Sequence, residues 1–257
     1  MVETPTINES VYYYLSNVWY KGKMPTFYQS DNWELTSLLK TNYPKIKEEI
    51  EAYYAQNSEK MPSNFTPYDY REKGWKTLNL YTYGLKYKEN CQRFPVLDSV
   101  VRKIPGMTMT QIAVLEPGVR IKAHLGDTNT IIRNHMGISI PGTLPEIGLR
   151  VGQTEVCWEE GEVFSFCIVH RHYAWNYTKS YRIALIVDVV HPDFAGRVAA
   201  VCAESLALIA MKFVATKVKI LKNLPRPITR FLQLCLSIPF RIWLWVSNAF
   251  PTKPTNV

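Results

Sequence analysis

The chain of 257 residues has few cysteines, and the five present form no recognisable pattern. Cys91, Cys157, Cys167, Cys202 and Cys235 are widely spaced, and no C-x-x-C pair occurs among them. An odd, dispersed set of this kind argues against both a disulfide framework and a zinc knuckle. We therefore expect the thiols to be reduced.

Two kinds of segment are missing from the sequence as well. The first ten residues, MVETPTINES, contain neither the basic stretch nor the apolar stretch that is typical of a secretory signal. No internal repeat and no low-complexity run occurs in the sequence, which excludes solenoids and propellers. The reduced thiols and the missing secretory pattern together predict a cytoplasmic protein, with membrane association left open.

Acidic residues are nearly absent from the C-terminal quarter. Residues 195–257 hold nine Lys or Arg side chains and a single acid, Glu204, so the whole net charge of +8 arises there. The first 194 residues are electrically neutral. A neutral body with a basic tail is not typical of a nucleic-acid-binding core, and we expect no nucleic-acid partner.

The C-terminal quarter contains two long apolar and basic runs, VAAVCAESLALIAMKFVATKVKILKNL and ITRFLQLCLSIPFRIWLWVSNAF. Glu204 and Lys212 interrupt the first run, and Pro239 and Arg241 interrupt the second, so we expect neither to cross a membrane. Helices at a membrane surface, with their cations toward anionic headgroups, fit this pattern. Packing on the protein or a dimer contact fits it equally well. Residues 195–257 are therefore predicted to form a basic amphipathic helical tail with possible peripheral membrane contact.

The rest of the chain divides into a helical part and a β part. Residues 33–56 are predicted to be helical, because apolar side chains recur at helical spacing between Lys and Glu residues. From residue 75 onward come the β-rich runs WKTLNLYTYG, MTMTQIAVLEPG, IIRNHMGISIPG, GLRVG, TEVCW, GEVFSFCIV and YRIALIVDVV. About seven or eight short strands without intervening helices predict a mainly β jelly-roll barrel. We expect a helical cap over about 1–73 and the barrel over about 74–194.

One of these runs places two cationic side chains on the same face. In IIRNHMGISI, strand alternation points Arg133 and His135 to one side. A guanidinium and an imidazole that face the inside of a barrel are costly to bury without an anionic partner. We expect this face to hold a bound acid.

A second buried cation and two histidines extend this site. Arg182 begins the strongly apolar run RIALIVDVV, and its guanidinium there needs a carboxylate or phosphate, with Asp188 as the internal alternative. Ten residues earlier lies His172, and His124 precedes another strand. Two neutral imidazoles from distant strands, with positions left open for small molecules, suit a non-haem Fe(II) centre.

These residues belong to a set of motifs that resembles a known family. The run from about Gly74 to Phe194 resembles the aspartyl/asparaginyl β-hydroxylases, which are Fe(II)- and 2-oxoglutarate-dependent oxygenases with a double-stranded β-helix (jelly-roll) fold. The resemblance covers nearly half of the chain. The matching pieces, in order, are GW (74–75), FP (94–95), IPG (104–106), H-L-G-x-T-N (124–129), R-N-H (133–135), W-E-E-G (158–161), H-x-x-W (172–175) and R-I-A-L-I-V-D-V-V-H-P (182–192).

For the metal, the resemblance implies that His124 and His172 are the two iron ligands and take part in catalysis. Gly126 stands where other oxygenases carry the carboxylate of an H-x-D motif, as in the peptide hydroxylases of this family. Asp127 is adjacent, but the pattern gives it no ligand role. His170 lies two residues from His172, and the interval to Arg182 favours His172 as the ligand.

For the cosubstrate, the resemblance implies that Arg182 holds the distal carboxylate of 2-oxoglutarate and that Arg133 and His135 complete its pocket. Ala113 stands where family members often offer a hydroxyl group. The implied reaction consumes dioxygen, converts 2-oxoglutarate to succinate and hydroxylates an unactivated C–H bond.

The resemblance leaves two substrate classes open. One is the Asp or Asn side chain of a peptide, which the H-L-G-x-T-N motif favours. The other is a lipid acyl chain at a membrane surface, as in relatives that act on lipid A or ornithine lipids. Ile131, where the animal peptide hydroxylases carry an arginine for their acidic substrate, favours the lipid, as does the basic tail. A halogenase, and a non-catalytic module that binds a membrane or partner, are further alternatives.

Overall fold

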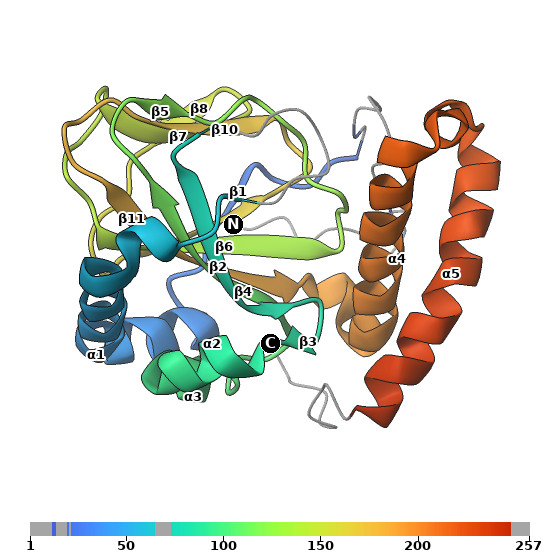
Figure 1. Ribbon diagram of the computed structural model, residues 1–257, viewed down its shortest axis with the longest axis horizontal. Helices are drawn as coiled ribbons and strands as arrows, with labels where there is room; N and C mark the ends of the chain where they lie inside the picture. The colour runs from blue at the N-terminus through green and yellow to red at the C-terminus, as the bar shows by residue number, and fades with distance from the viewer. Residues whose placement is uncertain (1–11, 14–19, 21, 65–72, 248–257) are drawn as a thin grey trace.

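The computed structural model describes residues 12–13, 20, 22–64 and 73–247 of the chain (Figure 1). Its centre is a pair of antiparallel sheets that face each other. The seven-stranded sheet has the order β1-β9-β6-β11-β4-β2-β3, and the four-stranded sheet has the order β5-β10-β7-β8. From β4 to β11 the chain passes back and forth between the two sheets, with β7 and β8 together in the small sheet, as in a double-stranded β-helix. The predicted jelly-roll fold is confirmed.

The strands of the large sheet are β1 (Phe27–Tyr28), β2 (Trp75–Thr82), β3 (Leu85–Lys86), β4 (Met107–Leu115), β6 (Ile131–Ser139), β9 (Val163–Cys167) and β11 (Arg182–Val190). Those of the small sheet are β5 (Val119–Arg120), β7 (Ile147–Val151), β8 (Thr154–Val156) and β10 (His172–Asn176). Every predicted β-rich run forms a strand. The sequence analysis missed the four strands β1, β3, β5 and β10, which are short and lack a long alternating pattern.

Strand β11 shows why one run has no polar alternation. All nine of its residues are buried, because it lies between β6 and β4 in the middle of the large sheet. One of its faces packs under the helices and the other faces the small sheet, so both faces favour apolar side chains. The charged residues Arg182 and Asp188 in this strand are therefore exceptions that require a partner inside the protein.

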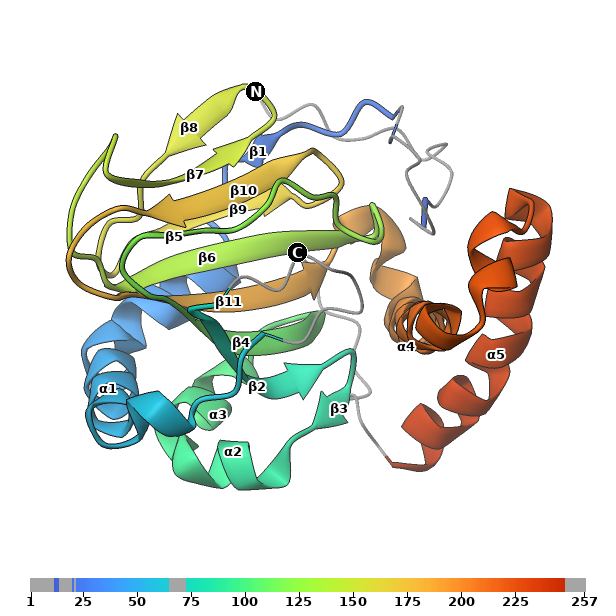
Figure 2. The same cartoon turned by 45° about the horizontal axis from the view of Figure 1, so that its top comes forward.

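Helices α1 (Glu34–Asn57), α2 (Lys88–Arg93) and α3 (Pro95–Val101) cover the outer side of the large sheet (Figure 2). The predicted helix over 33–56 is confirmed by α1. The expectation that no helix interrupts the β region was wrong, because α2 and α3 lie between β3 and β4. Pro95 is the first residue of α3, a position where its missing N–H costs nothing.

The C-terminal tail forms two long helices, α4 (Val198–Lys217) and α5 (Arg226–Val246), which pack side by side at one end of the barrel. The 3₁₀ turns η2 (Pro192–Arg197) and η3 (Lys219–Asn223) flank α4, and η1 (Ser58–Lys60) follows α1. The predicted helical tail is confirmed.

Contrary to expectation, residues Pro192–Lys217 are long and apolar enough to cross a membrane by length and composition, although 56% of the window is buried inside the protein, as in a core helix. The two charges that interrupt this segment are paired. Glu204 accepts a hydrogen bond from Arg230 at 2.7 Å, and Lys212 forms an ion pair with Asp127 of the barrel. These pairs bind α4 to α5 and to the barrel.

Candidate active site

The inner face of the large sheet is fixed by strand register. Side chains directly opposite each other in paired strands lie on the same face. Arg133 is opposite Asp188, and His135 is opposite Ile186, while alternation along β11 adds Arg182 to the same side. The predicted shared face of Arg133 and His135 is therefore present, and β11 contributes one further cation and one acid to it.

His124 and His172 lie side by side, although 47 residues separate them in the sequence. Their backbones exchange two hydrogen bonds, at 3.0 and 2.9 Å, across an isolated β-bridge. The centroids of the two imidazole rings are 4.3 Å apart. We call these two side chains the imidazole pair.

Hydrogen bonds define which nitrogen of each ring carries a proton. Nδ1 of His124 lies 2.8 Å from the carbonyl oxygen of Lys122, and Nδ1 of His172 lies 2.8 Å from that of His170. A carbonyl oxygen only accepts, so both Nδ1 atoms donate and the lone pair of each ring resides on Nε2. Backbone hydrogen bonds of this kind are typical of histidines that bind a metal through the other nitrogen.

The imidazole pair is held in the neutral form that a metal requires. Burial lowers the pKa of His124, and the positive charge of Arg133 adds to this effect. Burial and the neighbouring His124 lower the pKa of His172 further, well below the usual value. Two neutral imidazole nitrogens placed side by side fit a first-row metal ion such as Fe(II).

The three positions near the pair that could supply a third ligand, Gly126, Asp127 and His170, do not do so in this structure. A Cβ atom at Gly126 would approach the carbonyl oxygen of Ile168 to 2.6 Å, so the Asp of an H-x-D motif does not fit there. The carboxylate of Asp127 is engaged by Lys212. His170 points away, with Nε2 at 3.0 Å from the carbonyl oxygen of Met24. Within the described residues, no group of three or more His, Cys, Asp or Glu side chains could hold a metal.

Arg182 is buried without an acid beside it in the described part of the chain. Its guanidinium lies 4.3 Å from the centre of the Trp158 ring, and its Nε atom has no hydrogen-bond partner. Burial lowers the pKa of Arg182 to about 9. A cation kept in this setting has an unmet requirement for an anion.

His135 lies next to this guanidinium and has an unmet polar atom of its own. The indole N–H of Trp158 donates to its Nδ1 atom at 3.2 Å, and the two rings stack. Its Nε2 atom is buried and unpartnered among the described residues. Because Nδ1 accepts, Nε2 carries the proton and is available to donate. Two unsatisfied donors, on His135 and Arg182, therefore lie around Trp158.

Arg133 differs from Arg182 in having an internal partner. Its Nε and Nη2 atoms each donate to a carboxylate oxygen of Asp188 at 2.8 Å. Burial by itself lowers the pKa of Arg133, but the Asp188 charge outweighs it and raises the pKa. The sequence offered Asp188 as the alternative partner of Arg182, and the structure gives it to Arg133.

A row of aromatic rings connects the imidazole pair to Arg182. His172 contacts Phe166 at 5.5 Å between ring centroids, and Phe166 contacts His135 at 5.1 Å. His135 stacks on Trp158, which packs against Arg182. Four of the predicted site residues, His124, His172, His135 and Arg182, therefore lie in one continuous group inside the barrel.

Three side chains in this group were not predicted as site residues: Phe166, Trp158 and Asp188. Trp158 stands in the W-E-E-G motif, and its position there was the available signal. The alternation of VFSFC pointed to an inward Phe166, but nothing local named its neighbours.

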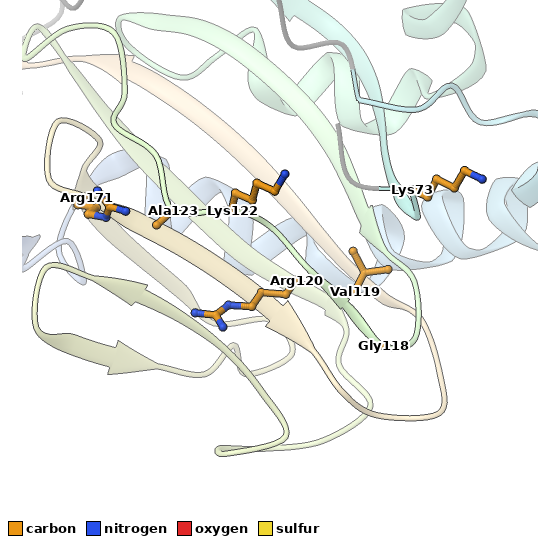
Figure 3. Close-up of a pocket in the computed structure, with 7 residues that line it drawn as sticks. All are labelled: Lys73, Gly118, Val119, Arg120, Lys122, Ala123 and Arg171. Atoms are coloured by element: carbon orange, nitrogen blue, oxygen red, sulfur yellow. The ribbon is translucent and has the colours of Figure 1, made fainter. Parts of the chain in front are cut away.

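A separate depression lies outside the barrel. It has a volume of about 740 Å³ and is lined by Lys73, Gly118, Val119, Arg120, Lys122, Ala123 and Arg171 (Figure 3). Arg120 lies 4.6 Å from the ring centre of Tyr173, which alternates with the inward His172 along β10 and so faces outward. This depression is therefore not the site of the imidazole pair.

The fold and the site together define a jelly-roll protein with an imidazole pair and a buried arginine, unpaired among the described residues, inside the barrel. The sequence profile described as aspartyl/asparaginyl beta-hydroxylase matches residues 40–192. The chain belongs to this hydroxylase family.

Individual relatives agree with this assignment. The chain is 30% identical over 172 residues to an ornithine lipid ester-linked acyl 2-hydroxylase of Rhizobium tropici, covering 65% of this chain and 61% of the relative. It is 31% identical over 168 residues to the human aspartyl/asparaginyl beta-hydroxylase, covering 62% of this chain and 21% of that protein. The chain therefore spans less than two thirds of the length of these relatives.

Among solved structures, the cupin domain of Schizosaccharomyces pombe Cnp3 overlaps with a TM-score of 0.33 at 10% identity, covering 49% of this chain and 72% of that one. This overlap is low, and the fold assignment rests on the strand order described above.

Proposed function

We propose that the protein is an Fe(II)- and 2-oxoglutarate-dependent hydroxylase. The observation that carries this proposal is Arg182, a buried guanidinium without an acid partner in the described chain, joined to the imidazole pair by a row of packed rings. An enclosed cation of this kind fits the distal carboxylate of a keto diacid.

The roles follow from the positions of the side chains. Nε2 of His124 and Nε2 of His172 would bind Fe(II), which supplies the redox chemistry that couples oxidation of 2-oxoglutarate to hydroxylation. Arg182 and the Nε2–H of His135 would bind the cosubstrate's distal carboxylate. Arg133, positioned by Asp188, would complete the cosubstrate pocket with its positive charge, which also acts on both imidazole rings. The buried positions of His135, His172 and Arg182 would limit the access of water to the reacting atoms.

The overall reaction balances as a dioxygenation. One oxygen atom of O₂ enters the substrate C–H bond as a hydroxyl group, and the other enters succinate, while CO₂ leaves from 2-oxoglutarate. The protein's own part is to orient the three reactants and hold their charges.

For the substrate we propose an aliphatic chain of a lipid. Ile131 lies two residues before Arg133 on the same strand and is fully buried, so this position offers no charge to an acidic side chain. Met109, Ala113 and Ile186 form a small apolar cluster apart from the main core, on the inner face of β4 and β11. The relative in Rhizobium tropici is named for acyl 2-hydroxylation. A peptide Asp or Asn side chain is the second candidate, after the human relative.

The test is an untargeted search for the product. Protein with Fe(II), ascorbate and 2-oxoglutarate is incubated with a host extract, and succinate and a mass gain of one oxygen are measured in lipids and in peptides. We expect both signals, with the mass gain in lipids. A gain in peptides would replace the lipid proposal by the peptide one. Absence of stoichiometric Fe(II) binding and of succinate would leave the non-catalytic module and overturn the proposal.

A further inference from the structure

Helix α5 has its polar side turned toward the protein. Thr229, Gln233 and Ser237 follow one another at intervals of four residues, which places them on one face of the helix, and all three are buried. Gln233 donates from Nε2 to the backbone carbonyl oxygen of Glu204 in α4 at 2.9 Å. The contact between the two helices is therefore partly polar.

The opposite side of α5 is apolar and exposed. Phe231 is 65% exposed and Trp245 is 80% exposed. Further exposed apolar side chains of α5 are Ile228, Leu232, Leu234, Leu236, Ile238, Ile242, Trp243 and Val246. In both ribbon views α5 is the outermost element, with α4 between it and the barrel (Figures 1 and 2). A surface helix of a water-soluble protein has the reverse arrangement, with its apolar side inward.

The apolar surface continues onto the neighbouring turn. Phe213 near the end of α4 and Ile220 in η3 are more than half exposed. So many large exposed apolar side chains on two neighbouring helices and their connection are unfavourable in water and are typical of an interaction site. We call the exposed apolar side chains of α5 together with Phe213 and Ile220 the outer face.

The charges around the outer face are of one sign. Lys217, Arg226 and Arg241 are exposed. Glu204, the single acid of residues 195–257, is buried and lies 2.7 Å from Arg230. The exposed cations of the helix pair and its connection therefore have no uncompensated acid within residues 195–257 to neutralise them.

We propose that the outer face binds the surface of an anionic lipid bilayer, with its apolar side chains in the acyl boundary and its cations among the headgroups. A second copy of the chain fits less well, because two outer faces would bring two sets of positive charge together. Trp243 and Trp245 near the end of α5 are exposed, and tryptophans are typical of side chains at a membrane interface.

Docking there would orient the site as well. Lys212 of α4 is buried and pairs with Asp127, which follows His124 by three residues. The helix pair is thus fixed to the loop that carries one member of the imidazole pair. The benefit of this orientation rests on the proposed function, since it would bring a lipid substrate to the active site. Vesicle binding itself requires neither metal nor cosubstrate. The membrane proposal and the hydroxylase proposal can therefore fail separately.

The experiment is co-sedimentation of the full chain with vesicles. We compare vesicles of phosphatidylcholine alone with vesicles that contain phosphatidylglycerol, for the wild type and for F231E/W245E. The matched control is Y177E, which changes an aromatic side chain that is 53% exposed after β10. We expect the wild type and Y177E to bind anionic vesicles at least tenfold more strongly than neutral ones, and F231E/W245E to lose at least tenfold in binding.

Circular dichroism and thermal melting verify that the variants fold. If a variant does not fold, the wild-type comparison between the two vesicle types decides alone. Wild-type protein that stays in the supernatant with anionic vesicles overturns the proposal, as does equal binding by folded F231E/W245E. A concentration-dependent dimer in sedimentation velocity that F231E/W245E converts to monomer, without vesicle binding by the wild type, would assign the outer face to a second copy instead.

Discussion

Arg133 and Asp188 face each other across the neighbouring strands β6 and β11, and the guanidinium donates to both carboxylate oxygens at 2.8 Å. Six residues before Asp188 on the same face, Arg182 lacks any such partner among the described residues. The barrel thus contains one neutralised arginine and one available for an anion, and the two can be distinguished by mutation.

Removal of the unpaired cation is expected to stabilise the protein without ligands. In R182M a buried charge gives way to an apolar side chain of similar length, so we expect the free energy of unfolding to rise by about 1 kcal/mol or more. The same variant should lose the rise in melting temperature that 2-oxoglutarate produces in the wild type with Fe(II). Thermal melting with and without 2-oxoglutarate measures both effects. A destabilised R182M that still responds to 2-oxoglutarate would show that Arg182 has a structural role only.

The paired cation should respond in the opposite direction. R133M leaves the fully buried carboxylate of Asp188 without its partner, and we expect a loss of about 3–5 kcal/mol in the free energy of unfolding. D188N should cost less, because Arg133 retains 21% exposure of its side chain and reaches water. Chemical denaturation of both variants measures the difference. An equal loss of unfolding free energy in R133M and D188N would contradict the idea that the more buried charge is the costlier one to leave unpaired.

Loss of either imidazole should weaken metal binding strongly. We expect H124A and H172A to bind Fe(II) about 100-fold more weakly or worse, because two nitrogens are the protein donors that the site offers. H170A is the matched control, since this histidine contacts the Met24 carbonyl and points away from the pair. Anaerobic calorimetric titration gives the affinities. A wild-type affinity in H124A or H172A would exclude that residue as a ligand.

Gly126 should not tolerate any side chain. A Cβ atom there lies 2.5–2.6 Å from Ile168 atoms, including its backbone oxygen, so we expect G126A to lose at least about 2 kcal/mol in stability. G126D should lose more, because it adds a charge to the same space. G118A serves as a reference, since a Cβ atom at Gly118 meets no atom within 4 Å, although its φ of +73° adds backbone strain. A G126D protein as stable as the wild type would mean that a third ligand can be accommodated.

Local patterns in the sequence determined much of the fold. The helical period over 33–56 and the β-rich runs became α1 and the long strands, because which side chains face inward depends on the spacing of neighbours along the chain. The same alternation correctly placed Arg133 and His135 on one face. The resemblance of the motifs to a hydroxylase family was confirmed by the match over residues 40–192.

The partners of the site residues were decided by the tertiary structure. Alternation says which face a side chain occupies but not which strand lies beside it, and only the order β6-β11-β4 assigned Asp188 to Arg133. The imidazole pair likewise depends on a bridge between residues that are far apart in the sequence.

In the C-terminal tail, too, the sequence determined the helices and the tertiary structure decided how they face the protein. Its composition indicated basic amphipathic helices, but periodicity does not say which side of a helix meets the protein. Glu204 of α4 is buried, so its carbonyl oxygen and its carboxylate need polar partners between the two helices. Gln233 and Arg230 of α5 supply them. The polar side of α5 therefore faces α4, and Trp245 faces outward. That requirement, which arises only when α4 and α5 pack together, turned the apolar side of α5 away from the barrel.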